Sequence, residues 1–472
     1  MCKTVKLINN EHVSLSEPLM TKTEMVDFND EIESEHRTPI DKLSQNVPIA
    51  ITFTGVAFIS RSLWNQNVLA MFIFQVSGRD SRTIGYVTSL MGLLQLFSSF
   101  PGGYFADKYR RDIVIRYSAV IGILSTALVV SAVALKNLWL IGGAFATVGT
   151  YWGLTTTSIS ALFADSLTDE ERPKYITWRY TVQKLGNLTA PILATVMFAR
   201  AKNHWSEEDC ANIIYCSQAL GIISVLIPCF MSDDKISMRN TLSIESDVEE
   251  IGDHISMGSS GETAYTTLPE SDESVTSAEY GNDTYDKMIP ICICSADILQ
   301  GFANGMSVQF FPLFFANNLD MRPIYVQIVY MCSQGGQACG SLVGFKIGKV
   351  FGRCFATILL RFLGCIALGL MLLFGKIRLG PSIVCTFYVL RMIFTNSTVP
   401  LTGSILMDYV PKHHRGKWGS LDSLVKASWS GSAFIGGFLI HRYGIYSVFY
   451  VTIILQLIAT IPLFFILPKV YN

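Results

Sequence analysis

Long blocks of apolar residues, separated by short polar segments, fill most of the chain. The apolar positions form continuous blocks rather than the single stripe of an amphipathic helix, and about 20 apolar residues are enough for an α-helix to span a bilayer. The pattern therefore predicts an all-α membrane protein with about twelve transmembrane helices. The expected spans lie near residues 47–75, 83–105, 113–134, 138–163, 175–199, 209–231, 288–316, 323–345, 355–375, 380–407, 418–440 and 444–467.

The second half of this pattern repeats the first. Each half contains an Asp followed seven residues later by Arg, nine by Lys and ten by an aromatic residue: Asp165, Arg172, Lys174 and Tyr175, then Asp408, Arg415, Lys417 and Trp418. The two aspartates are 243 residues apart (408 − 165), and this offset places spans one to five onto spans seven to eleven. The repeat predicts two pseudo-symmetric six-helix bundles. Membrane proteins built in this way are often transporters with the site between the repeats.

Two polar regions flank or separate the predicted bundles. Residues 1–45 carry an acidic cluster and no early apolar core, which indicates a disordered cytoplasmic tail. Residues 232–287 are rich in Ser, Thr, Asp and Glu and form an acidic central cytoplasmic loop, either a plain tether or a phosphorylated segment. The bundles are then 46–231 and 288–468. A slight excess of Lys and Arg in the short loops on the side of the termini predicts cytoplasmic termini.

Composition narrows the class of protein. The chain is 50% hydrophobic and 15% charged, and its net charge is −1. Without a basic face we expect no nucleic-acid partner. The cysteines lie mostly in apolar runs without metal-ligand spacing, so we expect neither a metal nor another cofactor. We expect a monomeric multi-pass protein of the plasma membrane or an organelle membrane, with a small-molecule partner.

The loop after the second span carries a recognisable motif. Its sequence matches Gly-x-x-x-Asp-(Arg/Lys)-x-Gly-Arg-(Arg/Lys) at Gly103, Asp107, Lys108 and Arg111. It departs from that pattern at Arg110, where Gly is usual, and at Asp112, where a basic residue is usual. With the twelve spans and the repeat, the chain resembles the major facilitator superfamily. The resemblance implies transport by alternating access, with the first and fourth helix of each half lining a central cavity.

The same loops predict a cytoplasmic gate. Glycine at Gly103 permits close helix approach, and Asp165 could pair with Arg111 or Lys108 when this end is closed. A degenerate second copy ends in Gly352-Arg353, and Arg353 could pair with Asp408. The predicted gate and motif residues are Gly103, Asp107, Lys108, Arg111, Asp165, Arg172, Arg353, Asp408 and Arg415.

Polar residues at helical spacing mark the candidate solute site. They lie on single faces of the first, fourth, seventh and tenth spans. The substrate-binding candidates are Arg61, Trp64, Asn65, Tyr151, Gln300, Asn304, Arg391 and Thr395. Arg61 and Arg391 could hold an anionic group of the solute through two-pronged guanidinium bonds, and the aromatic residues could shape the pocket or simply pack.

Asp297 is the carboxylate that the sequence places nearest the membrane midplane. It lies roughly ten residues into its span, where an ionised group is costly unless it meets water, a partner or a ligand. We predict that it is the proton-coupling site; the alternative is a fixed structural pair with Arg391 or Arg61. Arg361, nearer a helix end, is expected to snorkel to the interface. Gln218 and Gln456 appear isolated in otherwise lipid-facing spans.

These features predict a secondary active transporter of a small polar or anionic organic solute, coupled to protons. An uncoupled uniporter and a non-transporting receptor with the same fold are the alternatives. The sequence contains no His-Glu-x-x-His, Gly-x-Ser-x-Gly, Walker or Gly-x-Gly-x-x-Gly motif, so we do not expect an enzyme.

Overall fold

The computed structural model describes residues 45–167, 171–201, 203–233, 288–409, 425 and 428–470. Every regular element within these ranges is a helix. The predicted tail and central loop lie outside the described residues, apart from residues 45, 232 and 233. So do Arg415 and the side chains of Asp107 and Arg172.

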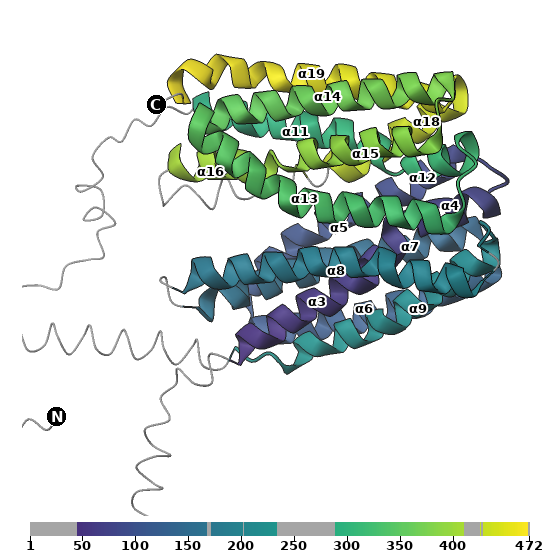
Figure 1. The fold of residues 1–472 in the computed structure, drawn as a ribbon. Coiled ribbons are helices and arrows are strands. Elements are labelled where there is room, and N and C mark those ends of the chain that lie inside the picture. The colour runs from purple at the N-terminus through teal and green to yellow at the C-terminus, as the bar shows by residue number, and fades with distance from the viewer. Residues whose placement is uncertain are drawn as a thin grey trace, which may run out of the picture.

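Two bundles of helices form the molecule (Figure 1). The N half contains α3 (Asn46–Asn65), α4 (Val68–Val76), α5 (Ser81–Lys108), α6 (Arg111–Leu135), α7 (Leu138–Asp165), α8 (Arg172–Arg200), α9 (Glu207–Leu226) and η1 (Ile227–Phe230). The C half contains α11 (Met288–Val308), α12 (Phe311–Leu313), η3 (Phe314–Asn318), α13 (Pro323–Phe351), α14 (Arg353–Ile377), α15 (Pro381–Asn396), α16 (Val399–Tyr409), α18 (Ala433–Tyr443) and α19 (Ile445–Val470). The all-helical fold of two bundles agrees with the sequence prediction.

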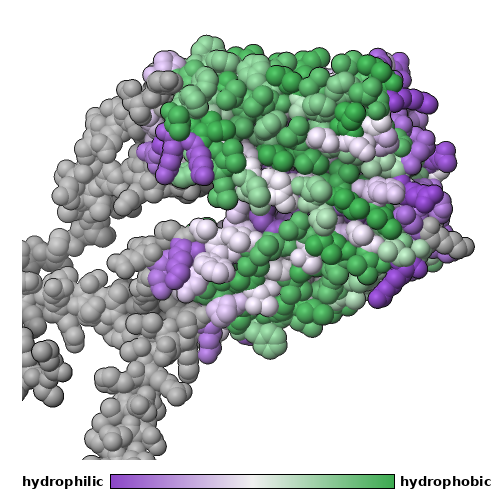
Figure 2. Space-filling view, viewed as in Figure 1, coloured by the Kyte–Doolittle hydropathy of each residue, from purple (hydrophilic) through white to green (hydrophobic). Residues whose placement is uncertain are grey.

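Eight helical segments of the described chain are long and apolar enough to cross a membrane. They correspond to the predicted spans one, two, three, six, seven, nine, ten and twelve. Helices α7, α8 and α13, with 28, 29 and 29 residues, are long enough to cross a membrane but are less apolar than these eight segments. The first part of the predicted span 418–440 is not described. Figure 2 shows an apolar band across the middle of the molecule with hydrophilic residues at both ends.

Three of the four spans expected to line the cavity are interrupted. The first breaks between α3 and α4 at Gln66–Asn67, and the seventh breaks between α11 and α12 at Gln309–Phe310, which is the corresponding position of the repeat. The tenth breaks between α15 and α16. Helix breaks at membrane depth are tolerated where the backbone is buried in protein or lines a cavity.

The two ends of the bundles differ. We call the end where α3 begins and α19 ends the terminal end, and the opposite end, which carries Asp80 and Trp205, the distal end. At the terminal end an open gap separates the halves, and toward the distal end the halves meet (Figure 2). Contacts between the halves are made mainly by α5 with α18 and by α8 with α13. The structure therefore opens between the halves at the terminal end.

Candidate functional site

Arg61 lies on α3 in the interior of the N half. Its Nη2 donates a hydrogen bond to Gln95 Oε1 of α5 at 3.1 Å, and its guanidinium lies 4.4 Å from the ring centre of Trp152 on α7. Both partners are neutral. The amide oxygen and the aromatic face stabilise the guanidinium cation but do not cancel its charge. Arg61 is half-buried, and no carboxylate among the described residues pairs with its guanidinium.

Two glycines on α7 place Gln95 against Arg61. A Cβ atom at Gly149 would lie 2.1 Å from the Met91 carbonyl oxygen, and one at Gly153 would lie 2.3 Å from that of Gln95. Only glycine permits this approach, so the backbones of α5 and α7 touch beside Gln95. The sequence motif predicted close packing at Gly103 instead, and this is wrong in the structure, because no described atom beyond its neighbours and the backbone of its own helix turn lies within 4 Å of a Cβ placed there. Gly102 is the residue that packs against α7.

A small cavity adjoins Arg61 inside the N half. It has a volume of about 30 Å³, enough for one water molecule, and is lined by residues of α3, α6, α7 and α9. The predicted site residues Trp64 and Tyr151 line it, as does Gln218 of α9. Gln218 is 6% exposed and is therefore not the isolated, lipid-facing residue that the sequence indicated. Asn65 is half-buried and lies outside this lining.

Arg391 lies in the interior of the C half. Its Nη2 donates to Asn304 Oδ1 at 3.0 Å, and the same oxygen accepts from Gln456 Nε2 at 2.8 Å. The guanidinium is fully buried, 4.9 Å from the ring centre of Phe311, and its Nε has no hydrogen-bond partner within the described residues. Gln456, like Gln218, is buried rather than lipid-facing.

Two further predicted site residues lie near this cluster in sequence. Gln300 precedes Asn304 by one helical turn on α11, and its Oε1 is buried without a partner among the described atoms. Thr395 follows Arg391 by one turn on α15 and packs against Gly364 of α14, where a Cβ would lie 2.8 Å from the Thr395 Oγ1. Both side chains are less than 9% exposed. The C-half candidates are therefore largely withdrawn from solvent in this conformation.

Asp297 forms an ion pair with a residue that the sequence had placed elsewhere. Arg361 Nη2 lies 2.5 Å from Asp297 Oδ1, and Arg361 Nη1 donates to the Ala459 carbonyl oxygen at 3.4 Å. The Arg361 side chain is 1% exposed, so the prediction that it snorkels to the interface is wrong. The Asp297 side chain keeps 29% exposure. The fixed-pair alternative named Arg391 or Arg61, and neither is the partner that is formed.

The repeated charges at the terminal end form matching ion pairs. Arg111 at the start of α6 pairs with Asp165 at the end of α7, and Arg353 Nη2 lies 2.5 Å from Asp408 Oδ2 in the C half. Each pair lies within one half and is formed while the halves stand apart at this end. Lys108 contacts Tyr104, with its Nζ 3.2 Å from the hydroxyl oxygen. The pairs thus tie neighbouring helices of one bundle together rather than one half to the other.

Polar contacts between the halves gather toward the distal end. Asn67 and Gln327 exchange two amide hydrogen bonds of 3.0 Å each, and both side chains are buried. The Trp205 indole donates to the Met321 carbonyl oxygen at 3.0 Å. On α5, the Ser89 hydroxyl accepts from the Phe434 amide at 2.9 Å. These contacts hold the halves together beyond the midplane.

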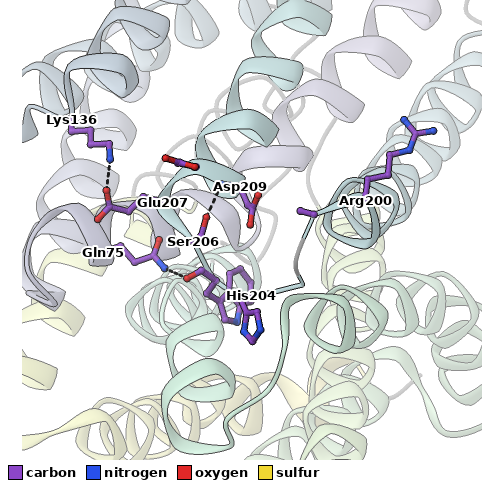
Figure 3. Close-up of a pocket in the computed structure, with 10 residues that line it drawn as sticks. Gln75, Lys136, Arg200, His204, Ser206, Glu207 and Asp209 are labelled. Atoms are coloured by element: carbon purple, nitrogen blue, oxygen red, sulfur yellow. Dashed lines mark hydrogen bonds and ion pairs between the residues drawn. The ribbon is translucent and has the colours of Figure 1, made fainter.

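The distal surface also carries charged groups outside the halves' interface. A wide depression of about 900 Å³ is lined by Gln75, Lys136, Arg200, Ala201 and residues 204–209 (Figure 3). Glu207 lies 2.6 Å from Lys136 Nζ, and this hydrogen bond raises the pKa of the lysine. Figure 3 shows Arg200 pointing away from this pair. The depression opens at the distal surface of the N half, apart from the arginines of the midplane.

Comparison with solved structures identifies the architecture. A bacterial homologue of the iron transporter ferroportin in the inward-facing state matches with a TM-score of 0.64 at 11% identity, covering 89% of this chain and 98% of that chain. The same homologue in an outward-facing state gives 0.54, with the same identity and coverage. A bacterial homologue of the human lysosomal transporter Spinster gives 0.63 at 13% identity, covering 90% and 96%. The nucleoside transporter NupG gives 0.61 at 15% identity, covering 90% and 98%.

The family follows from the sequence match. A search of curated proteins returned no match. The family model described as Major Facilitator Superfamily matches residues 51–246 and 293–471, which cover most of both halves. The helices of this chain, their arrangement in two bundles and the likeness to transporters of this fold agree with that match. The chain belongs to the major facilitator superfamily and is a multi-pass membrane transporter.

Proposed function

We propose that the protein is a secondary active transporter that moves a small anionic organic solute across the membrane by alternating access. The observation that carries the proposal is Arg61, a half-buried guanidinium near the midplane whose partners are an amide oxygen and an indole ring. A charge at this depth costs at least ~2.5 kcal/mol by insertion scales. A carboxylate or phosphate group of a bound solute would offset this cost through bidentate hydrogen bonds.

We further propose that the terminal end faces the cytoplasm. The halves stand apart at this end, and their arrangement is nearer to the inward-facing than to the outward-facing form of the ferroportin homologue, with TM-scores of 0.64 and 0.54. The slight excess of Lys and Arg in the loops of this end supports the same orientation. An epitope at the N-terminus should then be detected in cells only after permeabilisation.

Proton coupling would use Asp297. This carboxylate is partly exposed and pairs with Arg361, so protonation would remove the ion pair and release the arginine from its partner. A pair that forms and breaks as the cavity opens to each side would link proton movement to the transport cycle. The uncoupled uniporter remains the alternative to this part of the proposal.

The test is uptake by purified protein in liposomes. A panel of radiolabelled monocarboxylates, dicarboxylates and phosphate esters is offered with and without an imposed pH gradient. We expect at least one anion to accumulate, faster with the gradient, and Arg61→Gln to abolish its uptake. No uptake of any anion would contradict the proposed solute class.

The coupling step is tested separately on the same solute. In the double variant Asp297→Thr/Arg361→Ser, which removes both charges together, gradient-driven accumulation should vanish while solute exchange survives. Accumulation that persists in this variant would assign proton coupling to another group. Exchange without a gradient effect in the unmodified protein would identify a uniporter.

A further inference from the structure

We infer that Arg179, with Thr54 and Ser160, forms a second anion-binding subsite on the wall of the N half, nearer the open end than Arg61. The inference rests on the proposed function in taking the solute to be an anion. It assigns to α8 a role in receiving the carboxylate, phosphate or sulfonate group before that group reaches Arg61.

Arg179 reaches from α8 to two other helices. Its Nε donates to Thr54 Oγ1 of α3 at 3.1 Å, and its Nη1 donates to Ser160 Oγ of α7 at 3.3 Å. Its guanidinium lies 5.1 Å from the ring centre of Phe163. Both hydrogen-bond partners are neutral hydroxyls, so the positive charge stays available for an anion.

The hydroxyls differ in what they can offer. The Thr54 hydroxyl donates its own hydrogen to the Ala50 carbonyl oxygen at 2.8 Å. The Ser160 hydroxyl accepts from Arg179 and makes no other hydrogen bond within the described residues, so its hydrogen is available for an anion. Ser160 is exposed and Arg179 is half-buried, so an anion can reach both from water.

The subsite lies between the terminal end and Arg61. Thr54 precedes Arg61 on α3 by seven residues, which is two helical turns or about 10 Å along the axis. Because α3 begins at the terminal end, Arg179 is the nearer of the two guanidiniums to the opening. A solute that enters there meets Arg179 first.

The repeat supports a ligand role rather than a structural one. The residue 243 positions after Thr54 is Asp297, whose carboxylate neutralises Arg361 in the C half. The N half carries a threonine at that position, and no described carboxylate pairs with Arg179. Where the C half has a carboxylate paired with an arginine of α14, the N half therefore has a neutral hydroxyl that contacts an arginine of α8.

The charge at this subsite can be measured without knowing the solute. Ser160→Cys is introduced into purified full-length protein in which Cys2, Cys216, Cys332 and Cys339 are replaced by Ser. The new thiol is modified by two methanethiosulfonate reagents of similar size, one anionic (sulfonatoethyl) and one cationic (trimethylammonioethyl). Thiolate content affects both rates equally, so the rate ratio reports the local charge.

We expect Arg179→Gln to lower the ratio of anionic to cationic modification rates at least about tenfold. Arg179→Lys keeps the charge and should keep most of the ratio, which separates loss of charge from a folding defect. The matched control is Arg116→Gln, because Arg116 lies at a similar depth on α6, is exposed and pairs with Asp112. This control should leave the ratio unchanged.

Inorganic phosphate provides the second readout. Millimolar phosphate should slow anionic modification with Arg179 present and should not do so in Arg179→Gln. An unchanged rate ratio in Arg179→Gln, or equal phosphate protection in both proteins, would overturn the subsite. Neither measurement needs transport, so a protein that passes them and still shows no anion uptake would contradict only the proposed function.

Discussion

The first helices of the two halves, α3 and α11, occupy corresponding places in the repeat but carry different chemistry. Where α3 has Thr54 and Arg61, α11 has Asp297 and Asn304, each 243 residues later. In the N half the first helix supplies the cation, which Gln95 holds. In the C half the first helix supplies the amide of Asn304, which bonds Arg391 of α15, and the carboxylate of Asp297, which pairs with Arg361 of α14.

The first helices differ between the halves, whereas the ion pairs at the terminal end are alike in both. The ion pairs Arg111–Asp165 and Arg353–Asp408 join corresponding helices; the two aspartates are 243 residues apart, and the two arginines are out of that register by one residue. Contacts that hold neighbouring helices together serve both bundles equally, so duplication preserves them. A solute bound between the halves, as proposed here, would contact both of them, so at that site the halves would need complementary rather than identical groups.

The largest effect is expected from Asp297→Thr, which gives the C half the residue of the N half. The change leaves Arg361 buried without a counter-charge, so we expect a loss of about 3 kcal/mol in the free energy of unfolding. Because the Asp297 side chain is 29% exposed, we expect the loss to be at the low end of the range for breaking a buried ion pair. Thermal unfolding in detergent measures it.

The companion change Arg361→Ser provides the control. Ser118 occupies the corresponding position of the N half, so the double variant Asp297→Thr/Arg361→Ser reproduces the N-half pair of residues. It should recover most of the lost stability. A double variant as unstable as Asp297→Thr alone would show that the ion pair does not account for the difference between the halves.

The second effect concerns solute binding by the N half. Arg61→Asn gives α3 the residue of α11 and removes the cation without stranding a carboxylate. We expect the Kd of the transported anion to rise about 30-fold or more, as for loss of a charge-assisted hydrogen bond of ~2 kcal/mol. Ligand-induced shifts of the unfolding temperature measure the Kd, and a shift equal to that of the unmodified protein would contradict the role of Arg61.

The third effect concerns the contact that joins the halves. Replacing Asn67 by Leu leaves the buried Gln327 amide unsatisfied, which costs about 1–3 kcal/mol in the distally closed state. The population open at the distal end should rise about tenfold. Spin labels on the distal loops of the two halves report the distance. Asn67→Leu/Gln327→Leu should restore closure in part, because both polar partners are then removed.

The smallest effect is expected where the halves agree. Arg353→Gln and Asp408→Asn each break an ion pair whose side chains are 36% and 54% exposed, so each should cost less than about 1 kcal/mol. Exchanging the charges in the double variant Arg353→Asp/Asp408→Arg should recover the lost stability. A cost in the C half several-fold larger than for Arg111→Gln in the N half would contradict the equivalence of the pairs.

Much of the architecture could be predicted from the pattern of residues. Apolar blocks long enough to span a bilayer, and a repeat with a constant offset, require two bundles of helices whatever their detailed packing. The sequence named Arg111 (or Lys108) as a partner of Asp165 and Arg353 as a partner of Asp408, because these residues stand at the ends of adjacent spans, but it placed the pairs in the closed state; in the structure they form while the halves stand apart. Polar residues spaced along one face of α11 led to Asp297 and Asn304, and both contact arginines of neighbouring helices.

The partners of those groups were not predictable in the same way. Gln456 looked isolated in an apolar helix, yet it bonds Asn304, and Arg361 looked close enough to a helix end to reach water, yet it is buried against Asp297. Sequence spacing defines the face of a helix on which a residue lies, but not the helix that the face meets.

The sequence by itself determined that this chain spans the membrane as two related bundles, because hydrophobic length and periodicity act locally along the chain. Only the tertiary structure decided which arginine is neutralised by a carboxylate and which has neutral partners among the described residues. Arg61, Arg179, Arg361 and Arg391 are the same residue type in similar apolar surroundings. They differ in whether a neighbouring helix presents a carboxylate or a neutral group, and that depends on packing between segments far apart in sequence.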